Sequence, residues 1–166
     1  DPTPADAETI NTSYTTINVS INENVTSCIL TWTKQPGITT PYAWITNYAS
    51  NTVTKIGTDG TPYGDYATGS GPVGVAPDTN GNVWIANYGE SSISKINATD
   101  GSILEKYTTP GSQPSGIAVD SAGNIWAANN GPGTVSKINA TDGSMIVNYT
   151  VGTHPEGVAV DAKGDI

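Results

Sequence analysis

The residues that could perform acid–base catalysis are few, and they lie close together near the end of the chain. His154 is the only histidine, and Glu156 follows it two residues later. An imidazole and a carboxylate are the groups that most often exchange protons near neutral pH. The alternative, which the sequence favours, is a solvated loop histidine beside a proline. No serine-nucleophile elbow, phosphate loop or metal-ligand triad accompanies the pair.

Acceptor sites for N-linked glycans form the most frequent chemical signal. Six Asn-x-Ser/Thr sequons occur, at Asn11, Asn18, Asn24, Asn97, Asn139 and Asn148. The sequence around Asn97 repeats around Asn139, which indicates an exposed turn used twice. The sequence therefore predicts covalent glycans, with simple duplication of a turn asparagine as the alternative.

Three acidic turns could contribute oxygen ligands to a metal ion. Asp78, Asp120 and Asp161 each open an Asp-x-x-Gly-Asn run, although the last run ends in Asp instead of Asn. The bidentate Glu that completes a helix–loop–helix calcium site is missing. Aspartate also suits tight turns, because its carboxylate binds nearby main-chain amides. The pattern favours turn formation over metal binding, and no cofactor is predicted.

An internal repeat must position these residues. Trp44, Trp84 and Trp126 are 40 and 42 residues apart, and the dipeptides Lys-Ile at 55–56, 95–96 and 137–138 keep the same spacing. A period near 40 residues with several short strands is the signature of a β-propeller. We expect the three indoles to pack between blades, with ligand stacking as the alternative.

The fold prediction is all-β, with about three four-stranded antiparallel propeller blades and the start of a fourth. The third copy shows the strands most clearly, at 115–120, 125–129, 134–139 and 145–151, with turn residues between them. The predicted domain boundaries are 1–36 for an N-terminal segment and 37–166 for the propeller. Within the propeller, the expected blades are about 37–72, 73–114 and 115–156, with a stub at 157–166.

The N-terminal segment begins as a linker and continues as two expected strands, at 15–21 and 25–32. The only cysteine, Cys28, lies in the second, so no intrachain disulfide is possible. We expect it to be a small buried hydrophobe, with a cross-chain disulfide as the alternative.

One asparagine also recurs after each tryptophan strand, as Asn47, Asn87 and Asn129. A ring of these amides could line a ligand-binding face. The alternative, which we favour, is that each closes a turn through bonds to neighbouring groups.

The segment from Trp44 to Val53, Trp-Ile-Thr-Asn-Tyr-Ala-Ser-Asn-Thr-Val, resembles the YVTN-type propeller repeat. The runs at 116–126 and 157–165 resemble the related NHL and streptogramin-lyase-like propellers. The YVTN resemblance implies an archaeal cell-surface or surface-layer setting, and the N-terminal strands resemble an immunoglobulin-like module. The lyase resemblance implies catalytic roles for His154 and Glu156. An enzyme of this type, or a lectin-like propeller, is thus the alternative to a structural protein.

The net charge and the two ends of the chain predict which partners the protein has. The formal net charge of −9 argues against a nucleic-acid partner, and no run is apolar enough to span a membrane. We expect a non-enzymatic extracellular glycoprotein. The fourth repeat stops one residue before its expected tryptophan. We therefore expect either the remainder of a longer polypeptide or neighbouring copies, joined head to tail as a filament or ring, to complete the blades.

Overall fold

The computed structural model describes residues 7–12, 15–20, 42–57, 59–109 and 113–161. The chain forms two compact units, Asp1–Thr40 and Pro41–Ile166. In the first unit, β1 (Ala7–Thr12) pairs antiparallel with β2 (Thr15–Ser20). The sequence predicted β2 but not β1. The strand predicted at 25–32, with Cys28, lies outside the described residues.

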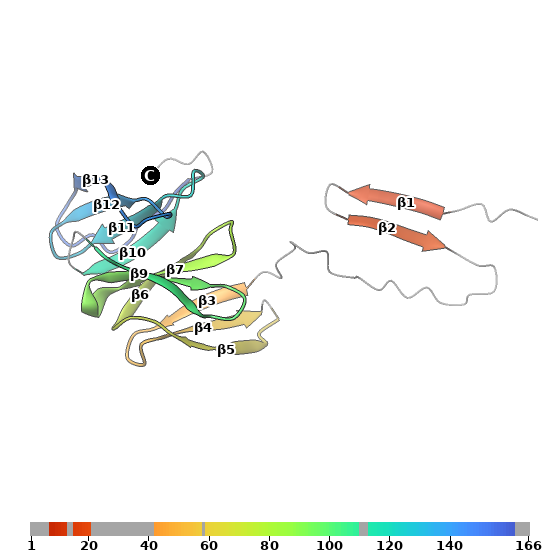
Figure 1. Ribbon diagram of the computed structural model, residues 1–166, viewed down its shortest axis with the longest axis horizontal. Helices are drawn as coiled ribbons and strands as arrows, with labels where there is room; N and C mark the ends of the chain where they lie inside the picture. Colours follow the sequence, from red (N-terminus) through yellow and green to blue (C-terminus); the bar gives the residue numbers. More distant parts are fainter. Residues whose placement is uncertain (1–6, 13–14, 21–41, 58, 110–112, 162–166) are drawn as a thin grey trace, which may run out of the picture. The chain divides into compact units, whose positions relative to one another are not determined.

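The second unit consists of three antiparallel sheets in chain order, as Figure 1 shows. The first holds β3 (Tyr42–Asn47), β4 (Thr52–Gly57) and β5 (Pro62–Ala67). The second holds β6 (Pro72–Pro77), β7 (Asn82–Asn87), β8 (Ser92–Asn97) and β9 (Ile103–Thr108). The third holds β10 (Pro114–Val119), β11 (Ile125–Asn129), β12 (Thr134–Ile138) and β13 (Met145–Thr150).

These sheets are the blades that the repeat predicts. The second and third blades have four strands each, and the first shows three strands among its described residues. A single-turn 3₁₀-helix, Tyr88–Glu90, is the only helix in the described part of the chain. None of the described helices is long and apolar enough to cross a membrane.

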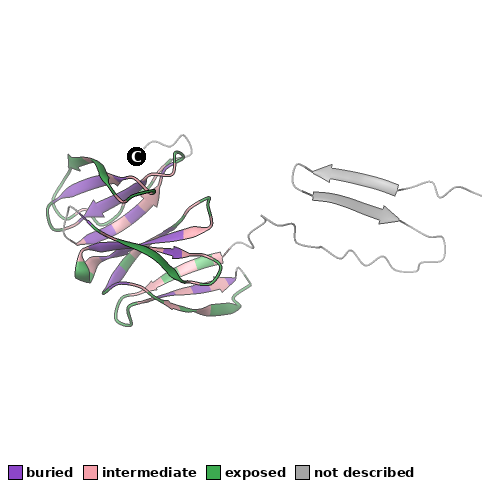
Figure 2. Ribbon diagram, in the orientation of Figure 1, coloured by how far each residue is buried: buried purple, intermediate pink, exposed green. Residues whose placement is uncertain are grey.

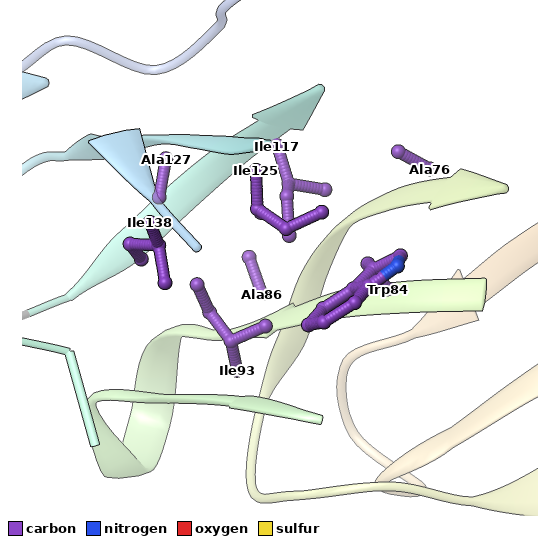
Figure 3. Packing of buried hydrophobic residues seen from close by; sticks show 8 residues of the cluster. All are labelled: Ala76, Trp84, Ala86, Ile93, Ile117, Ile125, Ala127 and Ile138. Atoms are coloured by element: carbon purple, nitrogen blue, oxygen red, sulfur yellow. The ribbon is translucent and has the colours of Figure 1, made fainter. Parts of the chain in front are cut away.

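The core lies between the blades. Val53 of the first blade packs with Val83, Ile85 and Ile96 of the second, all of them fully buried. On its other face, the second blade packs against the third, and the two sheets contribute the eight residues of the cluster in Figure 3: Ala76, Trp84, Ala86, Ile93, Ile117, Ile125, Ala127 and Ile138. Each blade thus buries its apolar faces only where a neighbour covers them.

The three tryptophans have different degrees of burial. Trp84 is fully buried and Trp126 is buried, whereas Trp44 is only half-buried. In every blade a tyrosine from the fourth strand position lies beside the indole; the Trp84–Tyr107 and Trp126–Tyr149 rings are stacked. The prediction that the indoles pack between blades therefore fits Trp84 best.

A glycine on each inner strand lets neighbouring blades approach. A Cβ built on Gly74 of β6 would lie 2.4 Å from the carbonyl oxygen of Ser115. A Cβ on Gly116 of β10 would likewise lie 2.7 Å from the Cα of Gly157. The fourth copy therefore lies beside β10 as β10 lies beside β6. Residues 151–161 contain no assigned strand in the described part of the chain.

Candidate functional site

His154 lies in the linker that leads from β13 into the fourth copy of the repeat. The equivalent positions in the two preceding linkers are Gly71 and Gln113. All three have left-handed backbone conformations, with φ of 55° at His154 and 59° at the other two. The linker geometry is thus repeated while the side chain changes from blade to blade, and only the third linker carries an imidazole.

In the first two linkers, a side chain accepts a hydrogen bond from the main-chain amide of the left-handed residue. The Asn51 side-chain oxygen accepts a hydrogen bond from the main-chain amide of Gly71, at 2.8 Å. In the second linker, the Ser91 hydroxyl plays the same role at 3.2 Å. Gly133 takes this position in the third blade and has no side chain to offer. His154 therefore lies in the linker without this side-chain clamp.

The His154 side chain is exposed and lines a cavity of about 240 Å³ together with Pro132, Gly133 and the end of β13. Glu156 is also exposed, and no hydrogen bond or ion pair joins the two side chains in the described structure. The arrangement offers a solvent-accessible imidazole for proton transfer. It does not provide the carboxylate contact that would orient the ring and raise its basicity.

Asp78 organises the turn between the first two strands of its blade. One carboxylate oxygen accepts main-chain amides of Asn80 and Asn82, at 2.8 and 2.9 Å. The other accepts the indole N–H of Trp84 at 2.9 Å. Burial alone raises the pKa of Asp78, but the hydrogen bonds from Asn82 and Trp84 outweigh it and lower the pKa below its ordinary value.

Asp120 repeats this arrangement and adds a cation. Its carboxylate accepts the Trp126 indole N–H at 3.0 Å and lies 3.1 Å from the Lys137 ammonium. Burial again raises the pKa, but the bonds from Asn124, Trp126 and Lys137 outweigh it and hold the pKa well below the ordinary value. A metal ion would have to displace these donors. Among the described residues, no three His, Cys, Asp or Glu side chains cluster as a metal site, and Asp161 is exposed at the equivalent position.

The recurring asparagines join the second and third strands of each blade. The amide nitrogen of Asn87 donates to the hydroxyls of Ser92 and Ser94, at 3.0 and 2.8 Å, and its oxygen accepts the Gly69 amide at 3.1 Å. Asn47 and Asn129 donate to hydroxyl pairs in the same register. Since Asn87 and Asn129 are fully buried, these amides stabilise the blade and do not form an exposed ring.

The sequon asparagines that can be placed lie on turns and outer strands. The side-chain oxygens of Asn97 and Asn139 accept the amides of Thr99 and Thr141, both at 2.8 Å, so each sequon forms the same tight turn. Both asparagines are half-buried, and Asn148 on β13 is exposed. Asn11 and Asn18 lie on β1 and β2, and Asn24 lies outside the described residues.

Sequence reasoning missed the role of the repeated lysines. The Lys55 ammonium donates to the Ala98 carbonyl in the next blade at 2.5 Å, and Lys95 reaches the Ala140 carbonyl at 3.3 Å. Each lysine also lies over the indole of its own blade, within 5.4 Å of the ring. The constant spacing of the Lys-Ile dipeptides was the available signal, but spacing does not reveal that a bond crosses between blades.

No family model matches this sequence, and no curated protein does. Solved structures do resemble it: hydrazine synthase of Kuenenia stuttgartiensis (19% identity, TM-score 0.68), a streptogramin B lyase (24%, 0.63) and virginiamycin B lyase of Staphylococcus aureus (21%, 0.60). The matches cover 74%, 74% and 70% of this chain and 36%, 42% and 41% of the respective structures. The chain thus spans less than half the length of each.

At these identities the likeness establishes the fold and nothing finer. The repeated four-stranded antiparallel sheets and the similarity to propeller structures define an all-β protein built of propeller blades. The predicted fold class is confirmed.

Proposed function

We propose that this chain is a non-enzymatic module of an extracellular cell-surface glycoprotein, and that it acts through blade architecture and surface contacts. The observation that carries the proposal is how the recurring polar residues are used. The Asp78 carboxylate binds its own turn and Trp84, the Asn87 amide joins two strands, and Lys95 reaches the next blade. The groups that the repeat preserves thus bind within a blade or to the next blade, which supports an architectural role over a catalytic one.

Glycans at the third-strand turns support the extracellular part of the proposal. Asn97 and Asn139 occupy the same turn in successive blades, and the following threonines, Thr99 and Thr141, are exposed. A transferase could therefore approach both acceptors from solvent in the same orientation. The archaeal-type surface setting and the immunoglobulin-like character of the N-terminal segment belong to this proposal as well.

The glycan test is intact-mass measurement on protein from its native source. We expect a mass above that of the bare polypeptide by the mass of one or more whole glycans. Asn97→Gln and Asn139→Gln should each remove the mass of one glycan. Asn80→Gln, in a turn without a sequon, should remove no mass of this kind. A mass equal to that of the bare polypeptide contradicts the proposal.

A propeller enzyme of the streptogramin-lyase type is the second candidate. Two observations favour it: the exposed His154 lines a cavity, and the fold resembles virginiamycin B lyase, whose histidine-to-alanine variant is catalytically inactive and was solved with quinupristin. The isolation of His154 from Glu156 weighs against it, because an unoriented imidazole is a poor general base.

Turnover of quinupristin separates the two candidates. We expect no ring opening above the uncatalysed rate, as followed by mass spectrometry. Activity that is lost in His154→Ala and kept in Gln113→Ala, the equivalent position in the preceding linker, would establish the enzyme and overturn the surface role.

A further inference from the structure

Several turns of the blades contain an asparagine or aspartate followed by glycine. In such a pair the main chain can attack the preceding side chain, because glycine has no side chain to keep its amide nitrogen away from the carbonyl carbon. All of these pairs lie between strands of one blade. They are Asp59–Gly60, Asn80–Gly81, Asp100–Gly101, Asn130–Gly131 and Asp142–Gly143.

The three aspartate pairs are held against this attack. The Gly101 amide donates a hydrogen bond to the Asn97 carbonyl at 2.8 Å. The amides of Gly60 and Gly143 each donate to a main-chain carbonyl of their own turn at 2.9 Å. A glycine amide that donates in this way cannot turn toward the preceding side chain without losing its bond, and that loss costs free energy.

The peptide group between Asn80 and Gly81 is held at neither end. In the part of the chain that the structure describes, no hydrogen bond reaches the Asn80 carbonyl or the Gly81 amide. The peptide groups on either side are fixed: the Asn80 amide donates to the Asp78 carboxylate at 2.8 Å, and the Gly81 carbonyl accepts the Ala98 amide at 2.9 Å. This one peptide group can therefore rotate while its neighbours keep their bonds, and Asn80 itself is exposed to solvent.

We propose that Asn80 is a site of spontaneous deamidation. The Gly81 amide nitrogen gives up its proton to a base from solvent and forms a bond to the side-chain carbonyl carbon of Asn80. The side-chain carbon–nitrogen bond breaks, and ammonia leaves with a proton in place of the one that was removed. A cyclic imide remains, and water opens it at either carbonyl to give aspartate or isoaspartate. The reaction consumes water alone and needs no oxidant, reductant or enzyme.

Asn130 provides an internal comparison. Among the described residues no hydrogen bond reaches the Gly131 amide, and the Asn130 amide donates to the Gln113 carbonyl at 3.0 Å. Asn130 is half-buried, however, whereas Asn80 is exposed. We expect the same reaction at Asn130, more slowly, because solvent base and water have less access to it.

The turn at Asn80 supports a buried indole, so the modification has a structural consequence. One Asp78 oxygen accepts the amides of Asn80 and Asn82, and the other accepts the Trp84 indole N–H. Strand β7 begins directly after this turn and is buried along most of its length (Figure 2). Isoaspartate adds an extra main-chain carbon between the two amides, which changes how they reach the Asp78 oxygen. The modification therefore loosens the turn that holds Trp84.

Peptide mass spectrometry tests the reaction on the full chain. The folded protein is kept at mildly alkaline pH in water enriched in heavy oxygen, so that only rings opened during the incubation acquire the label. We expect label at Asn80, less at Asn130, and none at Asn82, which precedes valine. An unlabelled Asn80, or equal label at Asn80 and Asn82, would overturn the proposal.

Asp100→Asn separates the effect of structure from that of sequence, because it places an asparagine before a glycine whose amide is bonded. The variant is made in a host without N-glycosylation, since the substitution also creates a sequon. In the folded protein we expect labelling at this position to be about fivefold slower than at Asn80, because a hydrogen bond must break first. In urea the two rates should become equal. Equal rates in the folded protein would overturn the structural argument.

Unfolding in urea tests the consequence for the turn. The isoaspartate form, separated chromatographically, should unfold at a lower urea concentration than the unmodified protein. Asn80→Asp is the matched control, since it adds the same charge without the extra main-chain carbon, and it should unfold close to the unmodified protein. Coinciding midpoints for the isoaspartate form and Asn80→Asp would contradict the loosening of the turn.

Discussion

The second blade and the first blade are built from the same sequence pattern, yet they differ in how much of it they bury. Ile85 and Trp84 of the second blade are fully buried, while Ile45 of the first is 40% exposed and Trp44 is half-buried. The second blade has four strands and a neighbour on each face. The first shows three strands and one neighbour among the described residues. The burial of equivalent side chains thus depends on which neighbouring blades cover them and not on their place in the repeat.

The largest expected effect distinguishes the two tryptophans. Trp84→Ala should lower the free energy of unfolding by about 3–5 kcal/mol, because it opens a cavity between blades and removes the bond to Asp78. Trp44→Ala should cost at least about 1 kcal/mol less, since part of its indole already meets solvent. Urea denaturation provides the measurement. Equal losses would show that the first blade is as well covered as the second.

A smaller effect, in acid, compares the aspartate turns. The pKa of Asp120 is lowered in the folded state, so the folded protein binds fewer protons than the unfolded chain between that pKa and about pH 4. Stability from Asp120 is therefore complete above about pH 4 and declines as the pH falls through the folded-state pKa.

Asp120→Asn should flatten this acid decline in a urea-midpoint series from pH 7 to pH 2, and Asp78→Asn should flatten it less, because Asp78 has no lysine partner. An unaltered slope in Asp120→Asn contradicts the assignment.

The smallest expected effect appears in alkali and concerns Tyr107 of the second blade. Burial, and then the hydrogen bond to Glu105, raise the pKa of Tyr107 to about 12. Since the unfolded phenol titrates near pH 10, stability from this group is complete below about pH 10 and is lost as the pH rises through about 12. Tyr107→Phe should remove the absorbance change that occurs near pH 12, and an unchanged titration at that pH contradicts the prediction.

Individual strands show which parts of the fold the sequence predicts. The predicted strand at 125–129 coincides with β11, and the one at 134–139 extends only one residue past β12. Apolar residues alternate there between glycine-containing turns, so the signal is local. Strand β1, Ala-Glu-Thr-Ile-Asn-Thr, went unpredicted because it offers only Ala7 and Ile10 as apolar positions. Antiparallel pairing with β2 makes this segment a strand, although its composition does not predict one.

For the candidate site, the sequence likewise predicted the local contacts and not those that depend on the backbone path. The sequence identified the Asp78 and Asp120 turns and favoured turn formation over metal binding, because short-range carboxylate bonds to nearby amides follow from spacing alone. It also identified His154 and Glu156 as the candidate catalytic pair. It did not determine that His154 stands apart from Glu156, since contact between two side chains depends on the linker's backbone path.

The sequence by itself determined the number of repeats, the strand alternation and the turns, because each of these depends on residues within a few positions of one another. Only the tertiary structure decided which faces are covered. Lys55 bonds to a carbonyl 43 residues away in the next blade, and the close approach at Gly74 depends on a strand 41 residues further on. Such contacts require a neighbouring blade. The repeat has the same residue pattern around Ile85, which a described neighbour buries, and around Ile45, which no described blade covers.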